Sequence, residues 1–122
     1  VSKGLNINKL VTIGADNSIS EILKIQIKKV NLKPIIAEKL ERIFEKKHRE
    51  KAINFSSEKV ANQVNIPTLV IHDSQDKYVP VSSALAIRQN LKYGELLITN
   101  GLGHHKVFKN SQVIQRIINF IQ

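Results

Sequence analysis

The hydrophobic residues of this chain fall into short continuous runs separated by stretches in which they recur every three or four positions. Short runs rich in β-branched residues and bounded by turn residues predict buried strands. Three segments have this character: "INKLVTIGA" (residues 7–15), "IPTLVIH" (residues 66–72) and "ELLITN" (residues 95–100).

The intervening stretches predict amphipathic helices, because one face of each is apolar. The first helix follows the capping-box sequence "SISE", in which Ser18 would cap the first-turn amides and Glu21 would reach back to Ser18. Pro34 suits the first turn of a second helix. Further helical segments are predicted near residues 57–64, in "VPVSSALAIRQNLK" and in "NSQVIQRIINFIQ".

The order of these elements predicts an α/β fold with three parallel strands joined by helical crossovers. A chain of 122 residues has the length of one domain, so we expect residues 1–122 to form a single unit. The first connection, residues 16–65, is about fifty residues long, although roughly a dozen suffice for a crossover. We interpret residues 16–65 as a helical insertion, either a lid over a site or a peripheral excursion.

Composition excludes several kinds of site. Cysteine is absent, which rules out disulfides, thiolate metal sites and cysteine nucleophiles. No apolar run approaches the roughly 20 residues that span a bilayer, and no signal peptide opens the sequence. We therefore expect a cytoplasmic protein with no membrane contact, no metal and no cofactor.

The formal net charge is +9, and residues 24–51 contribute most of it, with ten basic and four acidic residues. In these predicted helices glutamates alternate with lysines, which is typical of a solvated helix face. Few aromatic residues are present to stack on bases, so we do not expect nucleic-acid binding. A basic interaction surface for another partner remains an alternative.

Acidic and imidazole side chains follow the second and third predicted strands. Asp73 and Asp76 lie in "IHDSQDKYVP", and His104 follows two glycines in "NGLGHHKVF". The carboxyl ends of neighbouring parallel strands meet at one edge, so we expect Asp76 to lie beside His104. A carboxylate on one imidazole nitrogen fixes the tautomer and stabilises the imidazolium, which makes this pair a catalytic candidate. The alternative for Asp76 is an ordinary turn residue.

Nearby polar residues have simpler interpretations. His72, at the end of a strand, is expected to pack behind the site, and Ser74 is expected to cap backbone amides in the turn. His105 should leave the loop in a different direction from His104, and neighbouring histidines rarely bind one metal ion.

The two segments resemble the last third of an α/β-hydrolase. "PTLVIHDSQDKYVP" is similar to the family pattern in which the acid precedes Val-Pro by three residues, and "NGLGHHKVF" is similar to its Gly-x-Gly-His pattern. The resemblance implies that Asp76 and His104 are the acid and the histidine of a Ser-His-Asp triad, and that residues 16–65 form a lid. Asp73 stands where the family often has glycine and competes with Asp76, but the Val-Pro register favours Asp76.

The family's Gly-x-Ser-x-Gly nucleophile elbow precedes the acid and the histidine, and this sequence contains none. The chain therefore resembles the C-terminal portion of a serine hydrolase that acts on an ester or related acyl bond of a small molecule. An aspartate nucleophile, as in the dehalogenases of this superfamily, remains open. So does a non-catalytic α/β module that binds a partner through residues 24–51.

The resemblance also concerns assembly. In the family the strand that corresponds to "INKLVTIGA" pairs with a preceding strand, which this sequence lacks. Residues 9–14 would then form an unpaired sheet edge, and open edges of apolar strands pair with other chains. We expect self-association through this edge.

Overall fold

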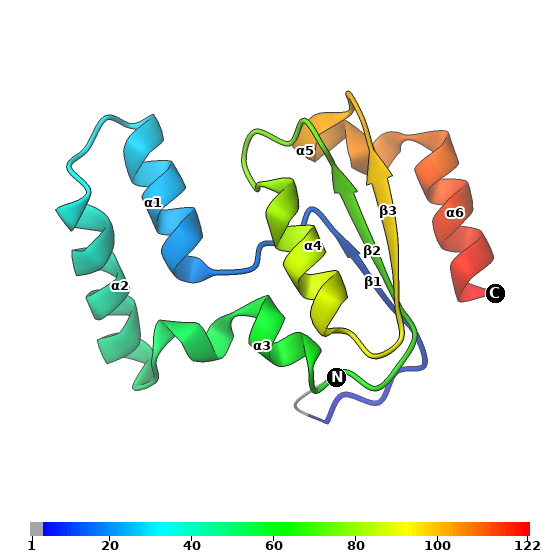
Figure 1. Cartoon of the computed structure of the whole chain (residues 1–122), viewed down its shortest axis with the longest axis horizontal. Coiled ribbons are helices and arrows are strands. Elements are labelled where there is room, and N and C mark those ends of the chain that lie inside the picture. Colours follow the sequence, from blue (N-terminus) through cyan, green and yellow to red (C-terminus); the bar gives the residue numbers. More distant parts are fainter. Residues whose placement is uncertain (1–3) are drawn as a thin grey trace.

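A sheet of three parallel strands lies at the centre of the computed structural model, which describes residues 4–122 (Figure 1). The strands are ordered β1 (Leu10–Ile13), β2 (Thr68–Asp73) and β3 (Gly94–Thr99). Thr68 lies between Leu10 and Gly94 in the sheet register, so all three strands start at one level. Their carboxyl ends consequently meet at one edge, and the predicted α/β fold with three parallel strands is confirmed.

Helices connect the strands in the predicted order. α4 (Val81–Asn90) joins β2 to β3, and α6 (Ser111–Ile121) closes the chain. The short helix α5 (Gly103–Lys106) was not predicted, because a single turn carries no helical periodicity. The long first connection contains α1 (Ile19–Lys29), α2 (Ile35–His48), the 3₁₀ turn η1 (Ala52–Phe55) and α3 (Ser57–Ala61), and a second 3₁₀ turn, η2 (Val107–Lys109), follows α5.

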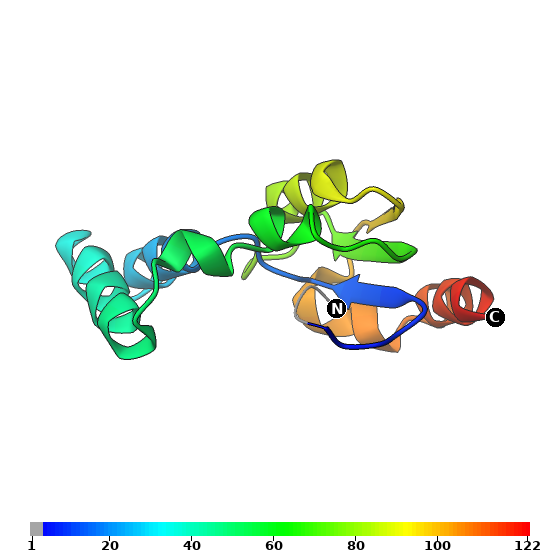
Figure 2. The ribbon, with the colours of Figure 1, turned by 90° about the horizontal axis from the view of Figure 1, so that it is seen from below.

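The core forms two layers, one on each face of the sheet. α4 and α6 cover opposite faces (Figure 2). Every residue of β2 is buried, and its side chains alternate between the layers. Val70 packs against α4, whereas Leu69 and Ile71 pack towards α6. Because β2 is buried on both faces, it reads in the sequence as a continuous apolar run.

The start of α1 corrects one detail of the predicted capping box. Ser18 Oγ accepts a hydrogen bond from the Glu21 amide (3.4 Å), as predicted. The Ser18 amide, however, donates to Asp16 Oδ2 (3.1 Å) and not to Glu21. Asp16 wins this position because a short aspartate side chain two residues upstream forms a local turn.

The two chain segments that lead into and out of the α1–α2 region are hydrogen-bonded to each other. Ser57 donates its amide to Asn17 O (2.9 Å) and its hydroxyl to Asp16 O (2.6 Å), and the Glu58 amide donates to Asn17 Oδ1 (2.9 Å). We call residues 16–17 and 57–58 the neck. Beyond it, α1 and α2 project away from the sheet (Figures 1 and 2). Their role as a lid remains a prediction.

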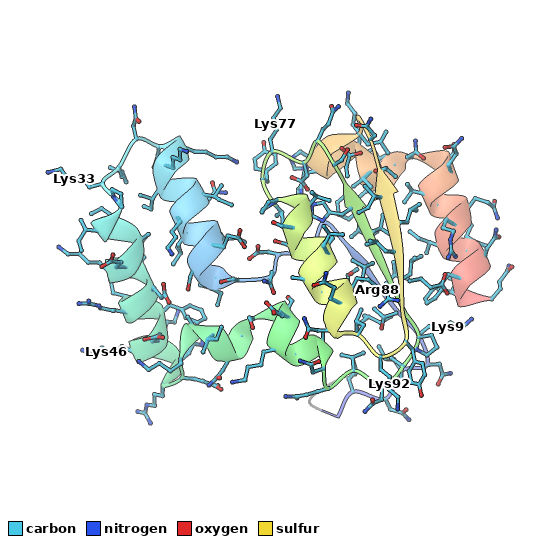
Figure 3. The ribbon with its side chains drawn as sticks, in the orientation of Figure 1. Lys9, Lys33, Lys46, Lys77, Arg88 and Lys92 are labelled. Atoms are coloured by element: carbon cyan, nitrogen blue, oxygen red, sulfur yellow. The ribbon has the colours of Figure 1, made fainter. Side chains whose placement is uncertain are left out.

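The basic side chains lie on the outside of the molecule. Lys33, Lys46 and Lys77 are exposed and point away from the ribbon (Figure 3). This is the arrangement of a solvated helix surface. Across residues 4–122, no helix combines the length and the hydrophobicity needed to cross a membrane.

The carboxyl end of β2 is anchored by the buried side chain of Asp73. Its Oδ2 accepts hydrogen bonds from the Thr99 hydroxyl (2.7 Å) and the Leu102 amide (3.0 Å), and its Oδ1 accepts from the amides of Gly103 (2.8 Å) and Gln75 (3.0 Å). Burial raises the pKa of this carboxyl group, but the four hydrogen bonds outweigh burial and lower the pKa from 3.8 to about 2. Asp73 thus ties β2 to the loop between β3 and α5.

Both outer edges of the sheet are open within residues 4–122, because β1 and β3 each pair only with β2. On β1 the Leu10 amide donates to Pro67 O (3.0 Å). Alternate residues of a strand direct their amides to the same side, so those of Val11 and Ile13 face the open edge.

The first prediction concerns this edge. We expect the chain to self-associate through β1, and we expect Val11→Pro to weaken association about fivefold or more. Proline removes an outward-facing donor worth about 1 kcal/mol while leaving the amides that bond β2 in place. Sedimentation velocity over a concentration series measures the effect.

Leu96→Pro on β3 is the matched control. The carbonyls of Tyr93 and Thr99 accept from β2, so the Leu96 amide points to the other open edge. This substitution should leave association through β1 intact. A monomer at all concentrations, or equal effects of both substitutions, would contradict the role of β1.

The second prediction concerns Asp73. Asp73→Asn should lower the free energy of unfolding at pH 7 by about 2 kcal/mol, which corresponds to the pKa depression from 3.8 to about 2. Because the folded-state pKa lies below the unfolded value, this stabilisation is complete above about pH 5 and is lost as the pH falls through 3.8 towards 2. Urea unfolding at pH 7, 4 and 2.5 should therefore show a smaller acid loss in the variant. Glu38→Gln, at an exposed carboxylate of α2, should change neither value, and equal acid slopes for Asp73→Asn and wild type would refute the assignment.

Candidate active site

Asp76 and His104 meet at the carboxyl edge of the sheet. Asp76 Oδ2 lies 2.6 Å from His104 Nδ1. Asp76 stands in the turn after β2, and His104 is the second residue of α5, which follows β3. The expected contact between these two side chains is therefore confirmed, whereas their catalytic roles remain a prediction.

The Asp76 carboxylate is buried and fixed by backbone donors. Its side chain is 1% exposed, and Oδ1 accepts hydrogen bonds from the amides of Tyr78 (2.8 Å) and Val79 (3.0 Å). Burial raises the pKa of Asp76, but the bonds from Val79, His104 and Tyr78 lower it, and the net shift is downward. The group is therefore a carboxylate at neutral pH, aimed at the imidazole.

His104 is held at one ring nitrogen and open at the other. Its side chain is 25% exposed, and within residues 4–122 only Nδ1 is hydrogen-bonded. Because a carboxylate only accepts, the neutral ring carries its hydrogen on Nδ1 and offers the Nε2 lone pair. An imidazole in this state can take a proton from a hydroxyl group at Nε2.

The structure separates the two aspartates that competed for the acid role. The two carboxylate oxygens of Asp73 together accept hydrogen bonds from the Gln75 amide, the Thr99 hydroxyl and two amides of the loop after β3. Asp76, in contrast, is hydrogen-bonded to His104. Asp73 therefore builds the loop, and Asp76 is the carboxylate that contacts the imidazole.

The structure confirms only some of the predictions for the polar residues around this pair. His72 is fully buried behind Asp76, with Nε2 3.0 Å from Val79 O and 3.6 Å from Asp76 Oδ2. The Ser74 hydroxyl donates to Asn100 Oδ1 (3.0 Å). The expected backbone cap is wrong, because the amides of Gln75 and Asp76 donate to the side chain and the carbonyl of Asp73. The His105 ring stands at 86° to that of His104.

Two further neighbours of His104 escaped the sequence analysis. The Tyr78 ring centroid lies 5.5 Å from that of His104, and Gly14, at the end of β1, borders the same imidazole. Neither carries a local signal, because each is brought to His104 from a different strand end. Over residues 4–122, no three histidine, aspartate or glutamate side chains are grouped so as to hold a metal ion.

Comparison with known proteins supplies the family. The model of the TAP-like protein family matches residues 47–122, which is more than half of the chain. A search of curated proteins found no match to this sequence.

Solved structures share the fold across nearly the whole chain. An esterase from Pyrococcus furiosus is 14% identical with a TM-score of 0.66 and covers 98% of this chain and 46% of its own. BpoC from Mycobacterium tuberculosis, a non-heme bromoperoxidase by name, is 12% identical with a TM-score of 0.62, at 94% and 57% coverage. The meta-cleavage product hydrolase CumD from Pseudomonas fluorescens is 16% identical with a TM-score of 0.55, at 93% and 55% coverage.

This chain thus spans about half the length of those proteins. At these identities the structural likeness shows the fold, and the family match covers the segment that contains both Asp76 and His104. The chain belongs to the TAP-like family of the α/β-hydrolase superfamily.

Proposed function

We propose that this chain supplies the acid and the histidine of a Ser-His-Asp triad, and that the nucleophile lies upstream in a longer protein that hydrolyses an ester or related acyl bond. The contact between the buried Asp76 carboxylate and His104 Nδ1, at 2.6 Å, carries the proposal. Its position after two consecutive parallel strands of an α/β-hydrolase chain adds support.

In the proposed triad each residue has one task. His104 Nε2 takes the proton of a serine hydroxyl as its oxygen attacks the substrate carbonyl, and then gives that proton to the leaving group. Water, activated in the same way, releases the acyl group. Asp76 keeps the hydrogen on Nδ1 and stabilises the imidazolium that forms at each step.

The α1–α2 region is suited to act as a lid because the end of α1 contacts the acid-bearing turn. Lys29 Nζ donates to Lys77 O (2.6 Å) and lies 4.4 Å from the centre of the Tyr78 ring. Tyr78 in turn borders His104. These contacts support a lid that stands beside the catalytic pair, over a small-molecule acyl substrate.

The third prediction tests the two roles in the full-length protein. His104→Ala should lower turnover of a short-chain nitrophenyl ester by on the order of a millionfold, because the serine hydroxyl loses the imidazole that takes its proton. Asp76→Asn should lower it by about ten-thousandfold, because the imidazole loses the tautomer that it needs. Stopped assays with purified proteins measure both values.

Lys46→Ala is the control for that experiment. Lys46 lies on the exposed side of α2, and its loss should leave turnover nearly unchanged. A full-length protein that retains activity after His104→Ala would refute the proposed function.

The fourth prediction is that the 122-residue chain is inactive by itself. It contains no Gly-x-Ser-x-Gly nucleophile, and loss of the nucleophile alone costs on the order of a millionfold in a serine protease. Oxyanion donors upstream would contribute roughly another hundredfold or more. Nitrophenyl ester turnover and titration with a fluorophosphonate test this, and stoichiometric labelling of the 122-residue chain would contradict it.

A further inference from the structure

Gly14 directly follows strand β1 and has a conformation that turns the chain away from the strand direction. Its amide donates to Ile71 O (2.9 Å), which is the last bond of the β1–β2 ladder. Its φ is +59°, in the left-handed region that side-chain-bearing residues rarely adopt. The residue therefore stands at the same sheet edge as the turn that carries Asp76.

The direction in which a side chain would leave Gly14 points at Asp76 and His104. A Cβ placed on this residue would lie 3.1 Å from both Nδ1 and Cε1 of His104, and 3.7 Å from Asp76 Oδ2. The first two distances are tighter than ordinary van der Waals contacts between carbon and ring atoms. A methyl group at this position would press on the nitrogen that bonds Asp76.

The imidazole has little room to withdraw from such a group. Its Nδ1 is bonded to Asp76 at 2.6 Å, and the Asp76 carboxylate is itself fixed by the amides of Tyr78 and Val79. The Tyr78 ring also lies beside the imidazole, with 5.5 Å between the two ring centres. Relief would therefore require the ring to rotate or to move away from Asp76.

We propose that Gly14 is a positioning residue for His104: the absent side chain leaves the space in which the imidazole meets Asp76 with Nε2 directed outward. This inference rests on the proposed function for its catalytic consequence, but the geometry can be tested without catalysis. With this role for Gly14, the ends of all three strands contribute to the site. Gly14 follows β1, Asp76 follows β2 and His104 follows β3.

The direct test uses nitrogen-15 NMR of the 122-residue chain, in which the ring nitrogen shifts of His104 report where the hydrogen resides. Wild type should show hydrogen on Nδ1 and a downfield Nδ1 proton bonded to Asp76. Gly14→Ala should lose that proton signal and move towards the ring nitrogen shifts of Asp76→Asn, which removes the accepting carboxylate oxygen.

Gly4→Ala is the control. Gly4 also has a left-handed φ, +90°, but a Cβ there would meet nothing within 4 Å, and the residue lies outside the loops that carry Asp76 and His104. The substitution therefore imposes backbone strain without touching the imidazole or its loop, and it should keep the wild-type signature. Gly14→Ala with the wild-type signature, or Gly4→Ala with the same loss as Gly14→Ala, would overturn the proposal.

A double-mutant cycle covers the case in which Gly14→Ala unfolds too readily for spectroscopy. If the methyl group clashes with the imidazole, the drop in melting temperature caused by Gly14→Ala should shrink when His104→Ala is also present. An equal drop in both backgrounds would mean that strain at Gly14 alone is responsible, and would overturn the proposal.

In the full-length protein, Gly14→Ala should lower kcat by about tenfold to a hundredfold with little change in KM, since small displacements of a catalytic group act on the chemical step. Gly4→Ala should stay within about twofold of wild type. A disturbed His104 signal in a protein that never showed hydrolysis would refute the proposed function and leave the placement of His104 by Gly14 established. If Gly14→Ala kept both the wild-type His104 signal and the wild-type kcat, the positioning role of Gly14 would be refuted and the proposed function would stand.

Discussion

The architecture of the site depends on one buried carboxylate, that of Asp73, which bonds the surrounding loops and not the imidazole of His104. Asp73 gathers four hydrogen bonds from the turn after β2, the end of β3 and the loop that follows it. A buried carboxylate without donors would be costly, so these backbone groups are drawn to it and the two loops are locked together. Because two of these donors are the amides at the start of α5, the bonds also fix where α5, and with it His104, begins.

Given that anchor, the contact between Asp76 and His104 needs little else to form. Parallel pairing with a common starting level brings residues 28 positions apart to the same edge. Asp76 is oriented locally by two amides of its own turn, and His104 by the single turn of α5. The pair thus combines a local constraint on the carboxylate with a long-range constraint on the imidazole.

The sequence predicted those parts of the structure that depend on periodicity and chain order. The continuous apolar run of β2, the helical spacing of α1 and the two polar strand ends were enough to place Asp76 beside His104. The sequence did not predict the hydrogen bonds for which nearby groups compete. Asp16 displaced Glu21 as the partner of the Ser18 amide, because both choices satisfy the same donor and only local geometry separates them. The anchoring bonds of Asp73 and the proposed role of Gly14 were hidden for another reason, since each depends on atoms that come from other strands.

The neck has a consequence for how this fold can vary. Because Ser57 and Glu58 bond directly to Asp16 and Asn17, the two ends of the helical insertion are already closed before α1 and α2 are added. The entropy of closing a loop grows only slowly with its length, and here the closure is stabilised at the base. The insertion can therefore be shortened, lengthened or exchanged with almost no effect on strand register. The length and sequence of α1 and α2 can thus change while the sheet that carries Asp76 and His104 keeps its register.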